Sequence, residues 1–340
     1  MMMARRDPWG RRLRASAALL IVVAGSATCI AQTGSHLADS AQVAPSRWAA
    51  DLARIDDQMR SRGMAADNPR AHWVAARFDL TDVVSRVRHY AAARVNAPQE
   101  KLYLASLAMA CLEPVQPTLP ECDATDRLTD WTTRDTDNGF PLLLLAARAS
   151  KRNDNESTVA YLEQAAAMPR IDDYWSRGWL EFWEYVMALP IDADRAAKAE
   201  AAIGYAAAQP PPIASLLVPS NVCLGASGAT DSRRAACAKA GRAMAERGTT
   251  AATRSVGASI AEHNAADTGA AERARAMKAA LQVLNARCGA DTTVAVDALE
   301  SADPAIRART IDAWDKVVRQ KAALGEMAEC ERRLGSSTRP

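Results

Sequence analysis

The 340-residue chain is poor in aromatic residues and in patterns that favour strands. Aromatic side chains make up 5% of the sequence, with only three phenylalanines, and alternating β-branched runs are hard to find. Because sheets are built from β-branched and aromatic residues in period-two patterns, this scarcity argues against a β fold. Alanine, the strongest helix former, is the commonest residue. The composition therefore predicts an all-α protein.

The sequence also lacks a recognisable catalytic, metal or cofactor motif. A lone histidine in helical sequence is usually a packed or surface residue, and the four histidines are His36, His72, His89 and His263. Ser227 lies in a Gly-Ala-Ser-Gly run without the spacing of a serine-hydrolase elbow. Zinc sites need C-x-x-C or Cys/His groupings, which are absent. We assign no catalytic, metal or cofactor-binding residue, expect no cofactor, and do not expect an enzyme.

The first 31 residues have the three parts of an export signal. Five arginines are followed by an uncharged Ala/Leu/Val run over 15–24 and by small residues over 25–31. The apolar run is short and rich in alanine, whereas a membrane span needs about 20 strongly apolar residues. We predict a Sec signal peptide cleaved after Ala31, no integral span after cleavage, and a periplasmic or secreted protein. The alternative is a lipoprotein modified at Cys29, although the preceding residues fit a lipobox poorly.

The chain that remains after this cleavage has no strong excess of either positive or negative charge. It has 37 basic and 39 acidic side chains, a net charge of minus two. A near-neutral balance gives no electrostatic reason to expect nucleic acid or an anionic membrane surface. We therefore expect a protein or peptide partner and no nucleic acid.

The cysteines agree with export. Six remain after cleavage: Cys111, Cys122, Cys223, Cys237, Cys288 and Cys330. An even number in a chain bound for an oxidising compartment predicts three disulfides. Because the cysteines come in close couples, we predict the pairs 111–122, 223–237 and 288–330. Each of the two short loops would be stabilised by about 3 kcal/mol in the chain-entropy model.

Apolar residues recur at helical spacing along most of the chain. Met277, Leu281, Leu284 and Cys288 are three or four residues apart, and Gly289 is placed to end that helix. The pair Asp303-Pro304 is a cap and first-turn proline for a last long helix. The 288–330 disulfide would then tie the end of one helix to the far part of the next.

Residues 139–172 carry a repeat-like pattern of large and small packing residues. These are Leu142, Leu145, Ala146, Ala149, Thr158, Leu162 and Ala165, with Gly139 as the first position. The segment resembles a single degenerate tetratricopeptide repeat. It departs from the motif at Ala149, which stands where the motif has Tyr, and at Pro169, which comes one residue early. The resemblance implies a helical hairpin with its turn at 152–154, and stacked hairpins that present a binding groove.

Prolines mark the clearest break in the chain. Gln209 is followed by three prolines, which cannot continue a helix. We predict a loose N-terminus over 32–44, a helical lobe over 45–208 with the hairpin at 139–172, and a Pro-rich linker over 209–222. A second helical lobe follows over 223–334, with a frayed tail over 335–340. A continuous α-solenoid of stacked hairpins would give the same pattern.

One helix concentrates the aromatic residues of the chain: Tyr174, Trp175, Trp179, Phe182, Trp183 and Tyr185. Trp175, Trp179 and Phe182 fall on one helical face, which is typical of core packing. The alternative interpretation is that Trp183 and Tyr185, which lie off that face, line a groove for a peptide or glycan. An exposed aromatic patch would support it.

These patterns predict an exported, disulfide-bonded, all-α interaction or scaffold protein of the bacterial periplasm or cell envelope. Two alternatives stay open. One is an envelope enzyme whose site is assembled from residues scattered along the sequence. The other is a lipoprotein accessory factor.

Overall fold

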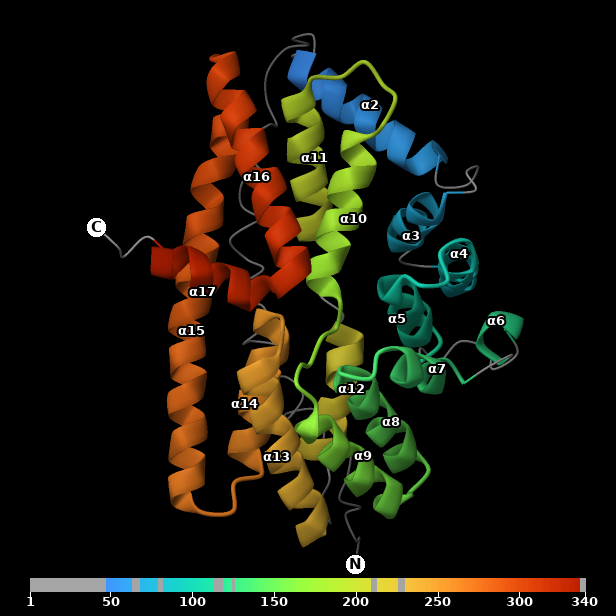
Figure 1. Cartoon of the computed structure of the whole chain (residues 1–340), viewed down its shortest axis with the longest axis vertical. Coiled ribbons are helices and arrows are strands. Elements are labelled where there is room, and N and C mark those ends of the chain that lie inside the picture. The colour runs from blue at the N-terminus through green and yellow to red at the C-terminus, as the bar shows by residue number, and fades with distance from the viewer. Residues whose placement is uncertain are drawn as a thin grey trace, which may run out of the picture. The chain divides into compact units, whose positions relative to one another are not determined.

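The computed structural model describes residues 47–62, 68–78, 82–112, 119–123, 126–208, 213–225 and 230–336. Helices make up the regular structure of this part of the chain, and it contains no strand (Figure 1). The predicted all-α class is confirmed. The predictions for the signal segment, Cys29, His36, the loose stretch 32–44 and most of the tail lie outside the described residues.

The first part of the chain forms short helices that end at loops. They are α2 (Arg47–Arg62), α3 (Pro69–Phe78), α4 (Val83–Asn96), α5 (Lys101–Ala110), α6 (Pro120–Asp123) and α7 (Arg127–Arg134). Side-chain caps set several of the starts. Asp82 accepts a hydrogen bond from the Ser85 amide at the start of α4, and Asp126 accepts one from the Thr129 amide at the start of α7. These bonds satisfy amides that have no partner within the helix.

Helices of the middle part are α8 (Phe140–Lys151), α9 (Asn155–Ala167), α10 (Trp175–Met187), α11 (Arg195–Ala208) and α12 (Ile213–Leu224). The α8–α9 pair is a helical hairpin whose turn, residues 152–154, lies where the repeat-like pattern predicts it. Helix α12 occupies most of the segment predicted to be a linker. The proline run therefore lies before a helix rather than at the start of a long linker.

The last part consists of longer helices. They are α13 (Asp231–Arg247), α14 (Ala251–His263), α15 (Thr268–Val296), the 3-10 helix η2 (Asp297–Glu300), α16 (Pro304–Leu324) and α17 (Glu326–Ser336). Asp303 caps α16 and Pro304 occupies its first turn, as predicted. Helix α9 packs between α8 and α13, and α14 packs between α13 and α15. Helix α10 contacts α3, α11 and α16.

One main hydrophobic core runs through the described chain. It includes Phe182 and Ile203 before the proline run, and Leu216, Met244 and Trp314 after it. A small separate cluster is formed by buried side chains of α13, α14, α15 and α17. The segments 45–208 and 223–334 therefore share a core, and residues 47–340 cluster as one compact unit.

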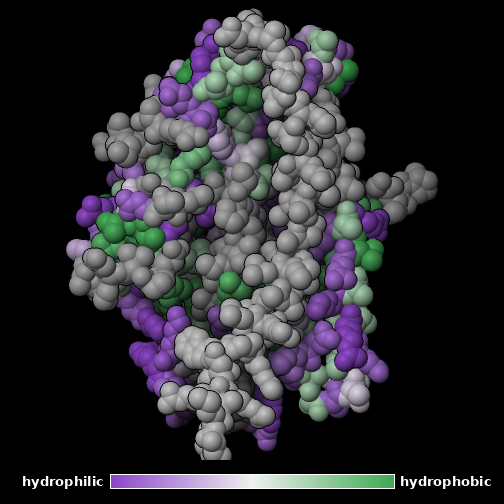
Figure 2. All heavy atoms as spheres, turned by 180° about the vertical axis from the view of Figure 1, so that it is seen from behind, coloured by the Kyte–Doolittle hydropathy of each residue, from purple (hydrophilic) through white to green (hydrophobic). Residues whose placement is uncertain are grey.

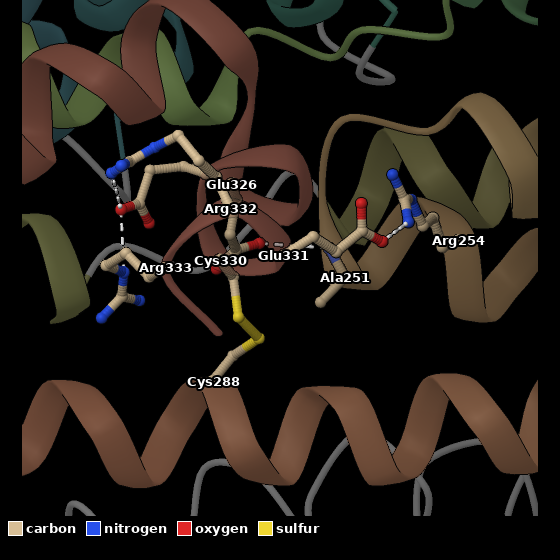
Figure 3. Close-up of a disulfide and its surroundings, with 9 residues drawn as sticks. Ala251, Arg254, Cys288, Glu326, Cys330, Glu331, Arg332 and Arg333 are labelled. Atoms are coloured by element: carbon tan, nitrogen blue, oxygen red, sulfur yellow. Dashed lines mark hydrogen bonds and ion pairs between the residues drawn. A yellow bond between two sulfur atoms is a disulfide. The ribbon is translucent and has the colours of Figure 1, made fainter. Parts of the chain in front are cut away.

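The three predicted disulfides are present as Cys111–Cys122, Cys223–Cys237 and Cys288–Cys330. Figure 3 shows the last of these joining α15 to α17. Polar contacts hold α17 on its other side, where Glu331 pairs with Arg254 at 2.7 Å and Glu326 accepts from the Ala251 amide at 3.1 Å (Figure 3). The short C-terminal helix is thus fixed to both α14 and α15.

Backbone hydrogen bonds between loops join the two halves of the chain. The loop before α10 is connected to the loop before α14, because the Thr249 amide donates to the Ile171 carbonyl at 3.0 Å. The first turn of α17 joins them, since the Met327 amide donates to the Thr249 carbonyl at 3.1 Å. This junction fixes the start of α10, which carries the aromatic residues.

Candidate binding pocket

An aromatic pocket opens where α3, α5, α10 and α11 meet. Its empty space is about 360 Å³, a value that includes solvent at the open mouth. The lining residues are Trp73, Arg77, Leu102, Ser106, Met109, Asp173, Tyr174, Trp175, Gly178, Trp179, Phe182 and Ala206. The pocket is thus mainly apolar, with a few polar groups.

Helical spacing places the principal walls. Trp73 and Arg77 are four residues apart on α3, and Trp175 and Trp179 are four apart on α10, so each pair shares a face. Gly178 lets the two walls approach, because a Cβ atom there would lie 3.0 Å from Cη2 of Trp73. The Trp73 indole donates to Ser106 Oγ at 2.9 Å, which fixes its orientation.

Cations stack on the indole rings of the pocket. The Arg77 guanidinium lies 5.8 Å from the ring centre of Trp73 and 5.4 Å from that of Trp175. The Lys321 ammonium lies 4.5 Å from the ring centre of Trp179. Burial lowers the pKa of Lys321. These cation–π contacts hold Trp175 and Trp179 in place while both side chains stay only half-buried.

Asp173 is a buried carboxylate at the edge of the pocket. It accepts hydrogen bonds from the Trp175 amide at 3.0 Å, from Thr250 Oγ1 at 3.0 Å and from Thr253 Oγ1 at 2.9 Å. Burial, with a smaller contribution from the charge of Asp172, raises its pKa to about 6. A raised pKa beside a pocket is one mark of a functional group. Here the three bonds come from the protein itself and join the starts of α10 and α14, which indicates a positioning role.

A second buried carboxylate, Asp135, supports the pocket from behind Tyr174. Asp135 accepts from Lys101 Nζ at 2.8 Å, from Tyr174 Oη at 2.8 Å and from Arg170. The Trp131 indole and the Asn138 amide also donate to it, at 3.1 and 2.8 Å. Burial acts to raise the pKa of Asp135, but these bonds outweigh it and hold the pKa below its usual value. Tyr174, with a positive φ of 61° immediately before α10, is fixed by this network.

Trp183 and Tyr185, the residues predicted to line a groove, are buried. Trp183 is 3% exposed and its indole donates to Asp315 Oδ1 at 2.8 Å, while Tyr185 is 9% exposed. The accessible aromatics of α10 are instead Trp175 and Trp179, which the helical stripe assigned to the core. Sequence reasoning missed Trp73 and Arg77 as their partners. The four-residue spacing of Trp73 and Arg77 indicates that they share a helical face, but the sequence gives no sign that this face packs against α10.

The surface carries no large continuous apolar area among the described residues. Its exposed large hydrophobic residues are scattered over α4, α12, α15 and α16, and Figure 2 shows hydrophobic residues in small patches among hydrophilic ones. In the same part of the chain, no three His, Cys, Asp or Glu residues form a metal cluster. No helix there is both long enough and apolar enough to cross a membrane.

Comparison with known proteins finds no matching family model, no matching curated protein and no matching solved structure.

Proposed function

We propose that this chain is an exported interaction or scaffold module of the bacterial periplasm or cell envelope, and that it binds a protein or peptide. The observation that carries the proposal is the pocket between α3 and α10. Its half-buried Trp175 and Trp179 offer aromatic faces that the surrounding cations hold in place. Preorganised aromatic side chains are the usual anchors of protein recognition.

The lining of the pocket indicates what it would hold. Its mainly apolar and aromatic side chains suit an apolar or aromatic side chain. We propose that a partner inserts such a side chain against Trp179, while the rest of the contact spreads over neighbouring helices.

Two observations support export and a repeat-type architecture. The three disulfides fit an oxidising compartment, in agreement with the arginine-rich, apolar and small-residue order of the first 31 residues. The α8–α9 hairpin has Ala146 and Ala165 fully buried where a tetratricopeptide-like pattern needs small residues. We propose that this hairpin is one unit of a helical-repeat scaffold.

Capture of partners from an envelope extract tests the proposal. The immobilised mature protein should retain a defined set of proteins, and Trp175→Ala and Trp179→Ala should lose part of that set because they remove the aromatic walls. Trp48→Ala is the matched control, since Trp48 is half-buried on α2 and does not line the pocket.

The capture experiment with these variants also has outcomes that would refute the proposal. Retention of the same set by the pocket variants would show that the pocket is not the binding site. Retention of no protein beyond that of blank resin would contradict an interaction module. Near-ultraviolet circular dichroism of each variant checks that its fold is intact.

A further inference from the structure

Two histidines that the sequence leaves separate meet on one helical hairpin. His72 lies on α3 and His89 on α4, and their Nδ1 atoms are 3.1 Å apart. The ring centres are 5.3 Å apart and the rings are tilted by 39°. Both residues are half-buried. The pair is separate from the residues that line the aromatic pocket.

The register of the hairpin brings these residues together. Helices α3 and α4 pack against each other and are joined by a short connection. His72 lies six residues before the end of α3 at Phe78, and His89 lies six residues after the start of α4 at Val83. In an antiparallel helix pair, residues equally far from the connection face each other. The contact therefore follows from the fold of the hairpin.

The separation of the two nitrogens matches that of two ligands on one metal ion. Metal–nitrogen bonds of about 2.0 to 2.1 Å place tetrahedral neighbours about 3.3 Å apart and square-planar neighbours about 2.9 Å apart. The observed 3.1 Å lies between these values, whereas ligands on opposite sides of an ion would be about 4 Å apart.

We propose that His72 and His89 form a binding site for a borderline divalent transition metal ion. Imidazole nitrogen suits copper(II) and zinc(II), and copper(II) binds such ligands most tightly of the first-row divalent ions. Binding needs a lone pair on both Nδ1 atoms, so each ring carries its proton on Nε2. The metal ion then replaces the hydrogen bond that the two rings otherwise share.

Among the described residues, no group of three His, Cys, Asp or Glu side chains could hold a metal ion, so the proposal assigns the remaining coordination positions to water. An open two-imidazole site exchanges its ion readily and takes up metal without being needed for folding. This sets it apart from a closed structural zinc site, in which four protein ligands surround the ion.

Titration of the chain with copper(II), followed by electron paramagnetic resonance, tests the proposal. The protein should carry no histidine tag, because a tag would itself bind the ion. The expected spectrum is that of one bound ion with two nitrogen ligands, and zinc(II) should displace it only in large excess, because copper(II) binds such ligands more tightly. His72→Ala and His89→Ala should each weaken binding by about 10- to 100-fold or more, since loss of a ligand costs at least as much as loss of an outer-shell partner.

His36→Ala and His263→Ala are the matched controls, because His263 is exposed at the end of α14 and His36 lies before the described residues. Neither should change the affinity. If a variant of the pair fails to fold, imidazole nitrogen NMR of the unaltered chain decides: zinc(II) should shift Nδ1 of His72 and His89 and leave His263 in place. Unchanged affinity in both variants, or absence of nitrogen-bound copper in the unaltered chain, would overturn the proposal.

Discussion

At the residue scale, two buried aspartates near the pocket have opposite electrostatic environments. Asp135 is paired with Lys101 and Arg170, and its pKa lies below the usual value. Asp173 is bonded only to neutral donors in the described contacts, and its pKa is raised to about 6. The same side chain is thus held as a charge in one place and protonates near pH 6 in the other. Ionisation of Asp135 therefore stabilises the folded protein, whereas ionisation of Asp173 destabilises it.

Asp135→Ala should destabilise the protein by at least about 3 kcal/mol, because it leaves the buried donors of Trp131, Asn138 and Tyr174 without their acceptor. Asp137→Ala is the matched control. Asp137 pairs with the same Arg170 but its side chain is 54% exposed, so its loss should cost under about 1 kcal/mol. Urea unfolding of both variants measures the contrast. Equal losses would show that the network around Asp135 does not stabilise the fold.

Asp173→Asn should change how stability depends on pH. A carboxyl whose pKa is raised on folding contributes stability at low pH, which is lost as pH rises through the folded-state pKa of about 6. Asparagine cannot titrate. The unfolding free energy of the variant, relative to that of the natural chain, should therefore increase by about 2 to 3 kcal/mol between pH 4 and pH 7.

Urea unfolding of the two proteins at both pH values measures this change, and other titrating groups cancel in the comparison. A constant difference between the proteins would mean that Asp173 is not held in a buried, uncharged environment. A change of the opposite sign would mean that a cation stabilises it.

At the element scale, some helix ends were predicted correctly and others were not: α15 continues through Gly289, which was expected to end it, as far as Val296. Asp303 and Pro304 mark the start of α16 through local hydrogen bonding and a fixed φ, which depend only on neighbouring residues. The faces of α10 were misassigned because this helix contacts α3, α11 and α16. A helix covered on several sides has no single apolar stripe. Trp183 is therefore buried although it lies off the stripe, and Trp179 is half-exposed although it lies on it.

Close packing of α13 against α14 depends on glycine. A Cβ atom at Gly257 would lie 2.5 Å from the Ala245 amide nitrogen, which is part of the facing backbone. Gly257→Ala should therefore push the helices apart and cost at least about 1 to 3 kcal/mol. Gly204→Ala in α11 is the control, because nothing lies within 4 Å of its added methyl, and it should stabilise by about 0.5 to 1 kcal/mol. Thermal unfolding of both variants reports the signs, and a stabilising Gly257→Ala would contradict this helix contact.

The α8–α9 hairpin is tested in the same way. Ala146 is fully buried, so Ala146→Trp should overpack the hairpin and cost at least about 1 to 3 kcal/mol. Arg148 is not a suitable control, because it pairs with Asp126 through both guanidinium nitrogens. Lys151→Trp at the exposed end of α8 should change stability by under about 0.5 kcal/mol. Similar small losses in urea unfolding would mean that the hairpin does not pack through Ala146.

At the scale of the whole molecule, local features were predictable and long-range packing was not. The disulfides Cys111–Cys122 and Cys223–Cys237 close short loops, so their pairing followed from spacing. The shared core depends on α9 meeting α13 and α10 meeting α16 across the proline run, and no local pattern encodes such contacts. The pocket was missed for the same reason, because Trp73 and Trp179 come from distant segments. Secondary structure and disulfides were thus readable, whereas the composition of the site required the tertiary fold.

The central claim, an exported and disulfide-bonded protein, is tested most directly by the intact mass of the native protein before and after reduction. Protein recovered from the periplasmic fraction should have the mass of a chain beginning at Gln32. Reduction should add six hydrogens, two for each of the three disulfides. A mass unchanged by reduction, with six free thiols, would contradict the claim, as would a chain that keeps its first 31 residues and stays in the cytoplasm. A lipid-bearing chain that begins at Cys29 would instead identify a lipoprotein.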